Sequence, residues 1–377
     1  MFARLQENQR VTVKLNWPAG STLIRSLLLF VLLAALIEIT ARSSLVQKHI
    51  PLQAYGTNHI QFESQLKNLD AFVAKKGAPD CLILGNSQAL RGIDPQKLEQ
   101  AYQEQTGQTL LCYNFGVVGT DIATTFYFDQ ILIHKYHPRL VIVGTNFLDY
   151  TQGRENRLDP RFEENDWIHY ELGQFSLQGW LLEHSYAFRL LKLFSYTAQD
   201  GLHFDRLEKE IASWNQQLTK YGYGYTPEIM DPSESMAKGS LRKFLRELGD
   251  FNLSRRNLDS LEGIIRLGQQ DGVQVVVVEM PYHPSLLQLT SENRDLASQQ
   301  ERLSQFIVEV NTAIREIAAR NHTVYWTSDQ VEALPEDGWL DRYHLNTFGS
   351  PIFSRWLANQ LATAVKSGQI ANPISRN

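Results

Sequence analysis

The stretch Cys81–Asp94, CLILGNSQALRGID, joins an apolar segment to a helical pattern through a short polar turn. The four apolar residues at its start end at Gly85, a pattern that predicts a short buried strand. Gly85 and Asn86 predict a tight turn, which places Ser87 just beyond the carboxyl end of that strand. Open α/β sheets bind their ligands at this edge. Ser87 is therefore a candidate nucleophile, with the capping of the following helix as its alternative role.

Further apolar runs alternate with helical patterns along the chain. We expect strands at residues 81–84, 109–118, 140–145, 273–280 and 323–327. Helical patterns are present at residues 95–105, 122–134, 258–270 and 350–365. Near-continuous apolar strands that alternate with helices are typical of a parallel sheet covered on both faces. The predicted fold class is α/β, a flavodoxin-like three-layer sandwich with a five-stranded parallel sheet.

A second polar stretch, Trp339–Pro351 (WLDRYHLNTFGSP), lies near the carboxyl end of the chain. Asp341 and His344 are three positions apart, a spacing that brings a carboxylate beside an imidazole on a helical turn. A nucleophilic serine needs a base, and the base needs a partner that fixes its tautomer. Ser87, His344 and Asp341 are therefore a candidate catalytic triad. An ordinary surface pair is the alternative for Asp341 and His344.

The amino-terminal region contains a candidate membrane anchor. Residues 26–37, SLLLFVLLAALI, carry no charge, and the apolar run reaches residues 23–41 if Arg25 and Glu38 lie near its ends. A helix needs about 20 such residues to cross a bilayer. Basic residues are more numerous before the run (Arg4, Arg10, Lys14, Arg25) than after it (Arg42, Lys48). This bias predicts a single-pass anchor of the cytoplasmic membrane with its amino terminus inside and an extracytoplasmic (periplasmic) domain. A cleaved signal peptide and a buried core helix are the alternatives.

The domain organisation follows from these elements. We expect a cytoplasmic leader (1–22), a transmembrane helix (23–41), a juxtamembrane stalk and helix (42–79), a first part of the α/β domain (80–149), an insertion (150–257), a second part of the α/β domain (258–368) and a tail (369–377). The insertion is much longer than a usual crossover between strands and is rich in aromatic residues. Because it leaves from the carboxyl end of the third strand, we expect a lid or a substrate-binding subdomain.

Composition excludes several functional classes. The 377 residues are 43% hydrophobic and 20% charged, which suits a chain with a sizeable core. The net charge of −5 gives no electrostatic footprint for nucleic acid, so we expect no such partner. The two cysteines, Cys81 and Cys112, fall in strand-like runs without metal-ligand spacing. We expect no metal and no cofactor, and a disulfide only if the registers of the two strands match.

Four short blocks, each at the end of a predicted strand or in the closing run, resemble the SGNH (GDSL-like) hydrolase superfamily. They are Gly85-Asn86-Ser87 at the nucleophile block, Gly119 at the oxyanion glycine, Asn146 at the oxyanion asparagine, and Asp341-x-x-His344 at the final block. The resemblance covers residues 80–146 and 273–365. It implies an oxyanion hole made by the backbone N–H groups of Ser87 and Gly119 and the amide of Asn146. Two positions differ from the family: Asn86 replaces the usual aspartate, and Phe147 follows Asn146 in place of an acid.

Three more polar residues near these blocks are candidate substrate contacts: Arg91, His283 and Asn346. For Arg91 the alternative is that it ties the helix start to a neighbouring loop together with Asp94. For His283 the alternative is a solvated loop position.

The order of the segments resembles that of membrane-anchored SGNH-like proteins of bacterial envelopes. These include the D-alanine transfer protein of teichoic acid modification and the acetylation proteins of alginate and related exopolysaccharides. The resemblance implies a glycan or an acylated envelope polymer as partner, with a membrane-bound O-acyltransferase as a candidate second partner. We therefore expect a serine O-acyltransferase or esterase that modifies an extracytoplasmic polysaccharide through an acyl-Ser87. The alternatives are a catalytically silent glycan-binding or assembly subunit, and a lipase or thioesterase.

Overall fold

The computed structural model describes residues 20–50, 52–155, 160–199, 203–231, 251–288 and 297–373. The chain divides into two compact units, Met1–Ile50 and Pro51–Asn377. The predicted leader up to residue 19, residues 232–250 of the predicted insertion and the last residues of the predicted tail lie outside the described residues.

The first unit contains the predicted membrane-spanning helix. Helix α1 (Gly20–Arg42) has 23 residues, which correspond to about 35 Å at the usual rise per residue. It is long and apolar enough to cross a membrane, and it is the one helix of this kind in the part of the chain that the structure describes. A short helix, α2 (Ser44–His49), follows, and the side chain of Ser43 caps it by accepting the N–H of Val46. The first unit is thus consistent with membrane association.

The second unit is built on a five-stranded, all-parallel sheet with the order β2-β1-β3-β4-β5. The strands are β1 (Cys81–Gly85), β2 (Cys112–Asn114), β3 (Leu140–Thr145), β4 (Gln274–Glu279) and β5 (Val324–Trp326). The predicted α/β class and parallel sheet are confirmed, although β2 is shorter than the predicted run. The direction of winding reverses between β1 and β3, so their carboxyl ends form the switch point at which such sheets bind ligands.

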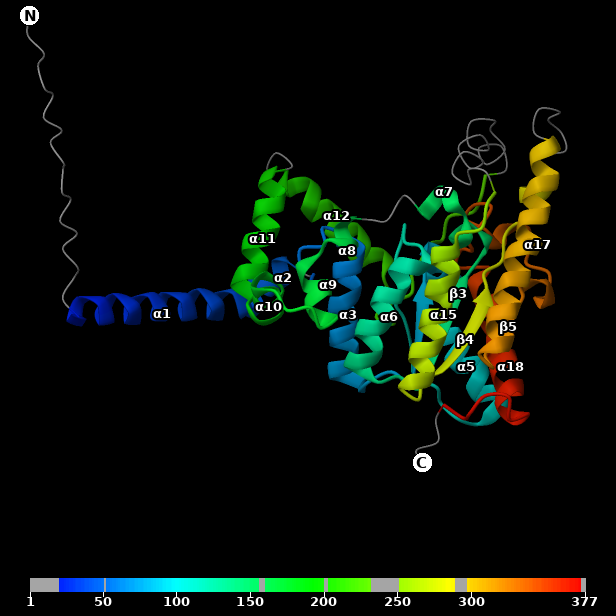
Figure 1. Ribbon diagram of the computed structural model, residues 1–377, viewed down its shortest axis with the longest axis horizontal. Coiled ribbons are helices and arrows are strands. Elements are labelled where there is room, and N and C mark those ends of the chain that lie inside the picture. Colours follow the sequence, from blue (N-terminus) through cyan, green and yellow to red (C-terminus); the bar gives the residue numbers. More distant parts are fainter. Residues whose placement is uncertain are drawn as a thin grey trace, which may run out of the picture. The chain divides into compact units, whose positions relative to one another are not determined.

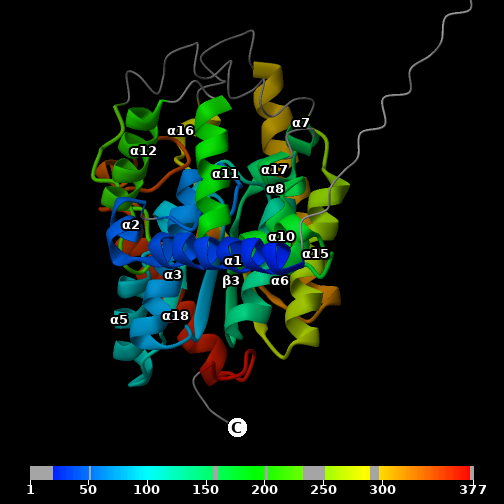
Figure 2. The same cartoon turned by 90° about the vertical axis from the view of Figure 1, so that its left-hand side faces the viewer.

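Helices cover both faces of this sheet. One face carries α3 (Ile60–Lys76), α6 (Ile122–Tyr136), α15 (Arg255–Gln270) and α17 (Ala297–Arg320), and the other carries α5 (Pro95–Thr106) and α18 (Ser350–Lys366) (Figure 1). Figure 2 shows α5 and α15 on opposite sides of β3. The layering is compatible with the flavodoxin-like arrangement expected from the sequence. The closing helix begins at Ser350, as the sequence predicts, and Gly349 takes the N-cap position.

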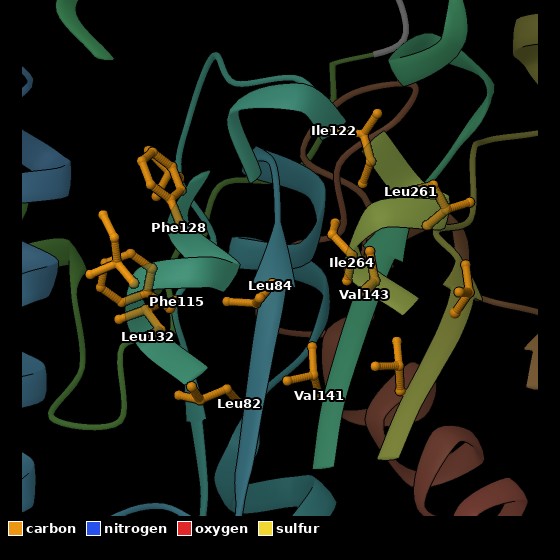
Figure 3. Packing of buried hydrophobic residues seen from close by; sticks show 14 of the residues in the cluster. Leu82, Leu84, Phe115, Ile122, Phe128, Leu132, Val141, Val143, Leu261 and Ile264 are labelled. Carbon is orange, nitrogen blue, oxygen red and sulfur yellow. The ribbon is translucent and has the colours of Figure 1, made fainter. Parts of the chain in front are cut away.

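Alternate strand residues point to the two helical layers. On one face Leu82 and Leu84 of β1 and Val141 and Val143 of β3 join a cluster with α6 and α15 (Figure 3). Their neighbours in sequence, such as Ile83 and Ile142, join the other cluster with α5 and α18. Strands buried on both faces explain why these segments read as continuous apolar runs in the sequence.

Helix α3 is the helix expected within residues 42–79, and it belongs to this core. Phe62, Leu66 and Leu69 are at most 2% exposed and pack into the cluster under α6. The buried side chain of Gln65 also donates hydrogen bonds to the carbonyl groups of Asn114 (3.1 Å) and Gly222 (2.8 Å). The apolar positions of α3 thus face the sheet.

Helix α17 was not among the predicted helices, although its sequence carries the signal for one. Leu303, Phe306, Val310, Ile314 and Ile317 are buried and recur at intervals of three or four residues. Such spacing gives an amphipathic helix an apolar face. This face lies in the same cluster as α15 and completes the layer over β4 and β5.

The insertion between β3 and β4 is helical in its described part. It contains η1 (Phe147–Tyr150), α7 (Gln152–Glu155), α8 (Pro160–Glu163), α9 (Asp166–Glu171), α10 (Leu177–His184), α11 (Tyr186–Gln199) and α12 (Phe204–Gln217). Trp167 is fully buried and stacks on Tyr55 with ring centroids 4.0 Å apart, so this aromatic residue serves the core. After α12 the chain returns to the sheet, where the backbone N–H of Asn114 in β2 donates to the carbonyl group of Tyr221. The backbone N–H of Gly224 donates to the carbonyl group of Leu90, which lies in the helix that follows β1.

The two cysteines lie side by side on neighbouring strands of the sheet. Cys81 and Cys112 occupy paired positions on β1 and β2, and both are buried free thiols. The registers thus match, but no disulfide joins the two residues.

Close approach of backbone requires a glycine at the end of β1. Gly85 pairs with Gly144 across β1 and β3 and has a φ of +140°, a value that residues with a side chain rarely adopt. A Cβ atom at Gly85 would lie 2.2 Å from the carbonyl oxygen of Gly144 and 2.9 Å from the Cβ of Ala89.

We expect Gly85→Ala to lower the free energy of unfolding by about 3 kcal/mol or more, because backbone strain and a backbone clash add together. Gly272→Ala is the matched control: Gly272 also has a positive φ, of +70°, but a Cβ atom there would have no described neighbour within 4 Å. That control should cost about 1 kcal/mol. Denaturant unfolding measures both values, and equal losses would contradict the proposed clash.

A carboxyl pair in the insertion makes stability depend on pH. Burial and the nearby charge of Glu183 raise the pKa of Glu171 to about 7. Between its ordinary pKa of about 4.5 and this value, the folded state binds a proton that the unfolded state has lost, so stability falls as pH rises through this window.

Glu171→Gln should remove this dependence, since the amide does not titrate. We expect the wild-type protein to lose stability between about pH 5 and pH 7 relative to the Glu171→Gln variant. Denaturant unfolding of both proteins at several pH values measures the difference. Parallel curves for the two proteins would show that Glu171 keeps an ordinary pKa.

Candidate active site

The turn after β1 presents Ser87 at the switch point. Helix α4 (Ser87–Gly92) begins directly after the turn, and the side chain of Asn86 caps it by accepting the N–H of Gln88 at 2.7 Å. Asn86 therefore fills the capping role that was the alternative for Ser87. The serine is left as a partly exposed first residue of the helix, with its hydroxyl available for another partner.

The loop that carries Asp341 and His344 is held by its own backbone. It follows η3 (Glu336–Gly338), and Oδ1 of Asp341 accepts the N–H groups of Tyr343 and His344, both at 2.9 Å. This turn, in place of the expected helical turn, brings the carboxylate to the imidazole. The N–H of Leu340 also donates to the carbonyl of His344 at 2.9 Å, which closes the loop.

The structure brings the three predicted triad residues together in one hydrogen-bonded chain. Oγ of Ser87 lies 2.7 Å from Nε2 of His344. Nδ1 of His344 lies 2.8 Å from Oδ2 of Asp341. Both distances fall in the range required of a nucleophile, its base and the orienting acid. Two loops that are 257 positions apart thus meet over the same edge of the sheet.

The charge state of Asp341 sets the direction of these hydrogen bonds. Partial burial alone would raise the pKa of its carboxyl group, but the hydrogen bond and the charge of His344 outweigh it and hold the pKa below the ordinary value. An ionised carboxylate only accepts, so Nδ1 of His344 carries the proton. In the neutral imidazole Nε2 is then an acceptor, and the Ser87 hydroxyl donates to it.

The three predicted oxyanion donors keep their N–H groups free of partners in the described part of the chain. Nδ2 of Asn146 is buried without a hydrogen bond there, while its Oδ1 accepts the N–H of Leu148 at 2.8 Å. Among the described residues, no hydrogen bond uses the backbone N–H of Ser87 or of Gly119. The segment before Gly119 runs beside β1, since the N–H of Val117 donates to Gly85 at 2.9 Å. It therefore reaches the edge of the sheet at which Ser87 lies.

Asp149 ties the nucleophile turn to the Asn146 turn, a role that the sequence reading missed. Its Oδ1 accepts the side-chain amide of Asn86 at 2.7 Å. Its Oδ2 accepts the hydroxyl of Thr145 at 2.9 Å and the N–H of Asn146 at 3.1 Å. The spacing Asn146-x-x-Asp149 is that of a capping box, and it is the sequence pattern from which a role for Asp149 in this turn could have been predicted. A carboxylate thus contacts the turn even though Asn86 replaces the family's aspartate.

The other candidate substrate contacts have different environments. The ring of His283 is hydrogen-bonded to the hydroxyl group of Ser285 through Nδ1 (2.6 Å) and to the carboxyl group of Glu336 through Nε2 (3.1 Å). In the described part of the chain it makes no hydrogen bond to Ser87 or His344. Arg91 follows Ser87 by one helical turn and is partly exposed.

Asn346 is committed to the loop. Its side-chain amide donates to the carbonyl groups of Glu228, Asp337 and Trp339 and accepts the N–H groups of Phe348 and Gly349. Because the residue is 0% exposed and these bonds occupy its amide, its geometry favours a structural role over the predicted substrate contact.

No cluster of three or more His, Cys, Asp or Glu side chains suited to a metal ion is present in the described ranges. No model of a known protein family matches this chain, and no curated protein is significantly similar to it in sequence.

The hydrogen bond between His344 and Asp341 predicts a spectroscopic signature that does not depend on activity. A proton shared between an imidazole N–H and a carboxylate is strongly deshielded because the bond is charge-assisted. We expect one such downfield proton resonance in the wild-type spectrum and its loss in Asp341→Asn. The surface variant Asp259→Asn is the control and should keep the signal. A wild-type spectrum without the resonance would contradict the assigned tautomer.

Proposed function

We propose that this protein is a membrane-anchored SGNH-like serine acyltransferase or esterase that acts on an extracytoplasmic polysaccharide. The observation that carries the proposal is the hydrogen-bonded chain Ser87–His344–Asp341 at the switch point of the sheet. Capped helices and buried polar networks occur in many folds, but this ordered set of nucleophile, base and acid is what acyl transfer requires.

The proposed reaction has two half-steps. The hydroxyl oxygen of Ser87 attacks the acyl carbon of the donor ester, and its proton passes to Nε2 of His344. Collapse of the tetrahedral intermediate breaks the bond to the donor alcohol, which leaves with that proton and gives an acyl-Ser87. A sugar hydroxyl or water then attacks this ester and transfers its proton to Nε2 of His344. Collapse of the second intermediate breaks the bond between Ser87 and the acyl group, and His344 passes that proton to Oγ of Ser87. Transferase and esterase differ only in this acceptor.

The free N–H groups near Ser87 support the proposal. The tetrahedral intermediate carries a negative oxygen, and the backbone N–H groups of Ser87 and Gly119 with Nδ2 of Asn146 are the donors we assign to it. A buried amide without a partner costs free energy in the resting protein. Such a group is explained if a ligand oxygen completes its hydrogen bonding during the reaction.

The cellular setting is also part of the proposal. The apolar helix α1 supports attachment to a membrane, and the excess of basic residues before it favours an extracytoplasmic domain. The resemblance to envelope proteins suggests a polysaccharide acceptor, with a membrane-bound O-acyltransferase as a candidate acyl donor partner. A silent glycan-binding subunit and a lipase or thioesterase are the outcomes against which the test below is designed.

A fluorophosphonate probe should label Ser87, and the protein should hydrolyse p-nitrophenyl acetate. We expect Ser87→Ala to abolish both, and His344→Gln to reduce both by about 1,000-fold or more because the general base is lost. Ser260→Ala on α15 is the matched control and should behave as wild type. Peptide mapping by mass spectrometry identifies the labelled residue.

Each result separates the candidate functions. A folded protein that neither labels nor hydrolyses esters, yet binds glycan equally well with and without Ser87, would favour the silent subunit. Turnover of long-chain esters or thioesters without transfer to any glycan would favour the lipase or thioesterase.

Asn146 allows the donor role to be tested apart from the capping role. Asn146→Asp keeps an oxygen that accepts the N–H of Leu148 but removes the Nδ2 donor. We expect about a 100- to 1,000-fold lower turnover of p-nitrophenyl acetate with a little-changed melting temperature. Asn165→Asp is the control, because Asn165 likewise caps α9 with its Oδ1. Unchanged turnover in Asn146→Asp would remove Asn146 from the oxyanion hole.

A further inference from the structure

We propose that the site recognises an anionic group of its substrate, a carboxylate or a phosphate, through the guanidinium groups of Arg91 and Arg342. This inference rests on the proposed function and names the chemical class of the substrate. It starts from two arginines beside the triad loops that form no ion pair within 4 Å in the described part of the chain.

Arg91 lies on the same helix as the nucleophile. It lies four positions after Ser87 on α4, a spacing that puts both side chains on one face. Its stem packs beside the loop after α12, since a Cβ at Gly224 would lie 3.4 Å from Cγ of Arg91. The acidic groups that act on it electrostatically are Asp341 and the exposed Glu228. No hydrogen bond joins the Arg91 side chain to any described residue.

Arg342 is buried without a partner for two of its nitrogens. It directly follows Asp341 and is 5% exposed, and its Nε and Nη2 form no hydrogen bond with any described residue. Its backbone is fixed, because the N–H of His283 donates to its carbonyl oxygen at 2.7 Å. An arginine stays charged in a protein. The charge of Asp341 acts on this guanidinium, but no described group accepts a hydrogen bond from Nε or Nη2, and an anionic ligand would supply such acceptors.

The carboxylate nearest in sequence is not available for this purpose. Oδ1 of Asp341 accepts two backbone N–H groups, and Oδ2 accepts Nδ1 of His344. Both carboxylate oxygens of Asp341 are therefore already hydrogen-bonded, one to the backbone of the loop and the other to His344. The forked donors of both arginines are left for an oxyanion from outside, and carboxylates and phosphates fit this planar geometry.

Other polar atoms at the same loops are unsatisfied in the same way. Oε1 of Gln88 is buried without a partner among the described residues, although Nε2 of this side chain donates to the carbonyl of Tyr343 at 2.7 Å. Nδ2 of Asn146 is the other example. Nδ2 of Asn146 is the donor assigned to the oxyanion, whereas Oε1 of Gln88 remains as an acceptor for a hydroxyl group of the same ligand.

Binding to the full-length Ser87→Ala protein tests the proposal without any turnover. The probes are a short oligogalacturonate, its fully methyl-esterified form, which differs only in lacking the charges, and inorganic phosphate. We expect calorimetry to show at least about tenfold tighter binding of the oligogalacturonate than of the methyl ester. Adding Arg91→Gln or Arg342→Gln should remove that preference, and Arg91→Lys should restore part of it. Arg255→Gln removes the same charge from the exposed start of α15 and should change nothing.

Stability gives an independent readout for Arg342. If its guanidinium is unpaired in the resting protein, Arg342→Met should leave the melting temperature unchanged or raise it. A strong loss of stability would show that the arginine has an internal partner and would overturn its proposed role.

The outcomes separate this inference from the proposed function. Equal binding of the acid and its methyl ester, with phosphate not bound, would overturn the anion site whatever Ser87 does. Phosphate binding that depends on both arginines and exceeds that of the oligogalacturonate would support the site and assign a phosphate to the substrate. Failure of Ser87 to react with the fluorophosphonate would overturn the acyl chemistry and leave the binding result intact.

Discussion

The close approach of Gly85 to Gly144 is the constraint on which the site depends. Because neither strand carries a side chain at this pair, α4 can pack against the ends of β1 and β3, with Ala89 near both glycines. The helix start that carries Ser87 is then fixed relative to the turn that carries Asn146. Asp149 strengthens this link by contacting both turns. Ser87, the proposed nucleophile, and Asn146, the proposed oxyanion donor, thus share one support.

The closing loop brings the base to this support from the other end of the chain. Asn346 holds the loop through four hydrogen bonds to the loop's own backbone and one to the carbonyl group of Glu228. Gln88, the residue after the nucleophile, reaches across to the carbonyl of Tyr343. The Ser87–His344 contact is therefore accompanied by a second hydrogen bond between the two loops. Preorganisation of this kind lets polar groups act on a developing charge without first reorienting.

Much of this architecture could be predicted from the sequence, because the strands at residues 81–85, 140–145 and 274–279 are buried on both faces and read as continuous apolar runs. The apolar residues after Asn114 extended the predicted second strand, although there the chain leaves the sheet ladder and runs past the end of β1. The helix expected within residues 42–79 is α3, but its sequence alone did not show that it packs on the sheet. The triad residues were predicted from spacing and resemblance.

The roles of residues whose environment depends on distant contacts could not be predicted from the sequence. Asp149 acts through Asn86, which lies 63 positions away. Arg342 has no motif of its own, and only its burial without a described partner marks it. Asn346 was a candidate substrate contact in the sequence, yet its amide is fully used by the loop. Packing and the satisfaction of polar groups, which no single segment reveals, decide these cases.

The most direct test of the central claim is to trap the covalent intermediate. Rapid acid quenching after mixing with p-nitrophenyl acetate, followed by peptide mass spectrometry, would detect an acyl group on the enzyme. The account predicts one acetyl group on the peptide that contains Ser87, formed at the rate of the initial burst and absent from Ser87→Ala. Hydrolysis of the ester with an unmodified Ser87 peptide, or acetylation at another residue that carries the turnover, would contradict it.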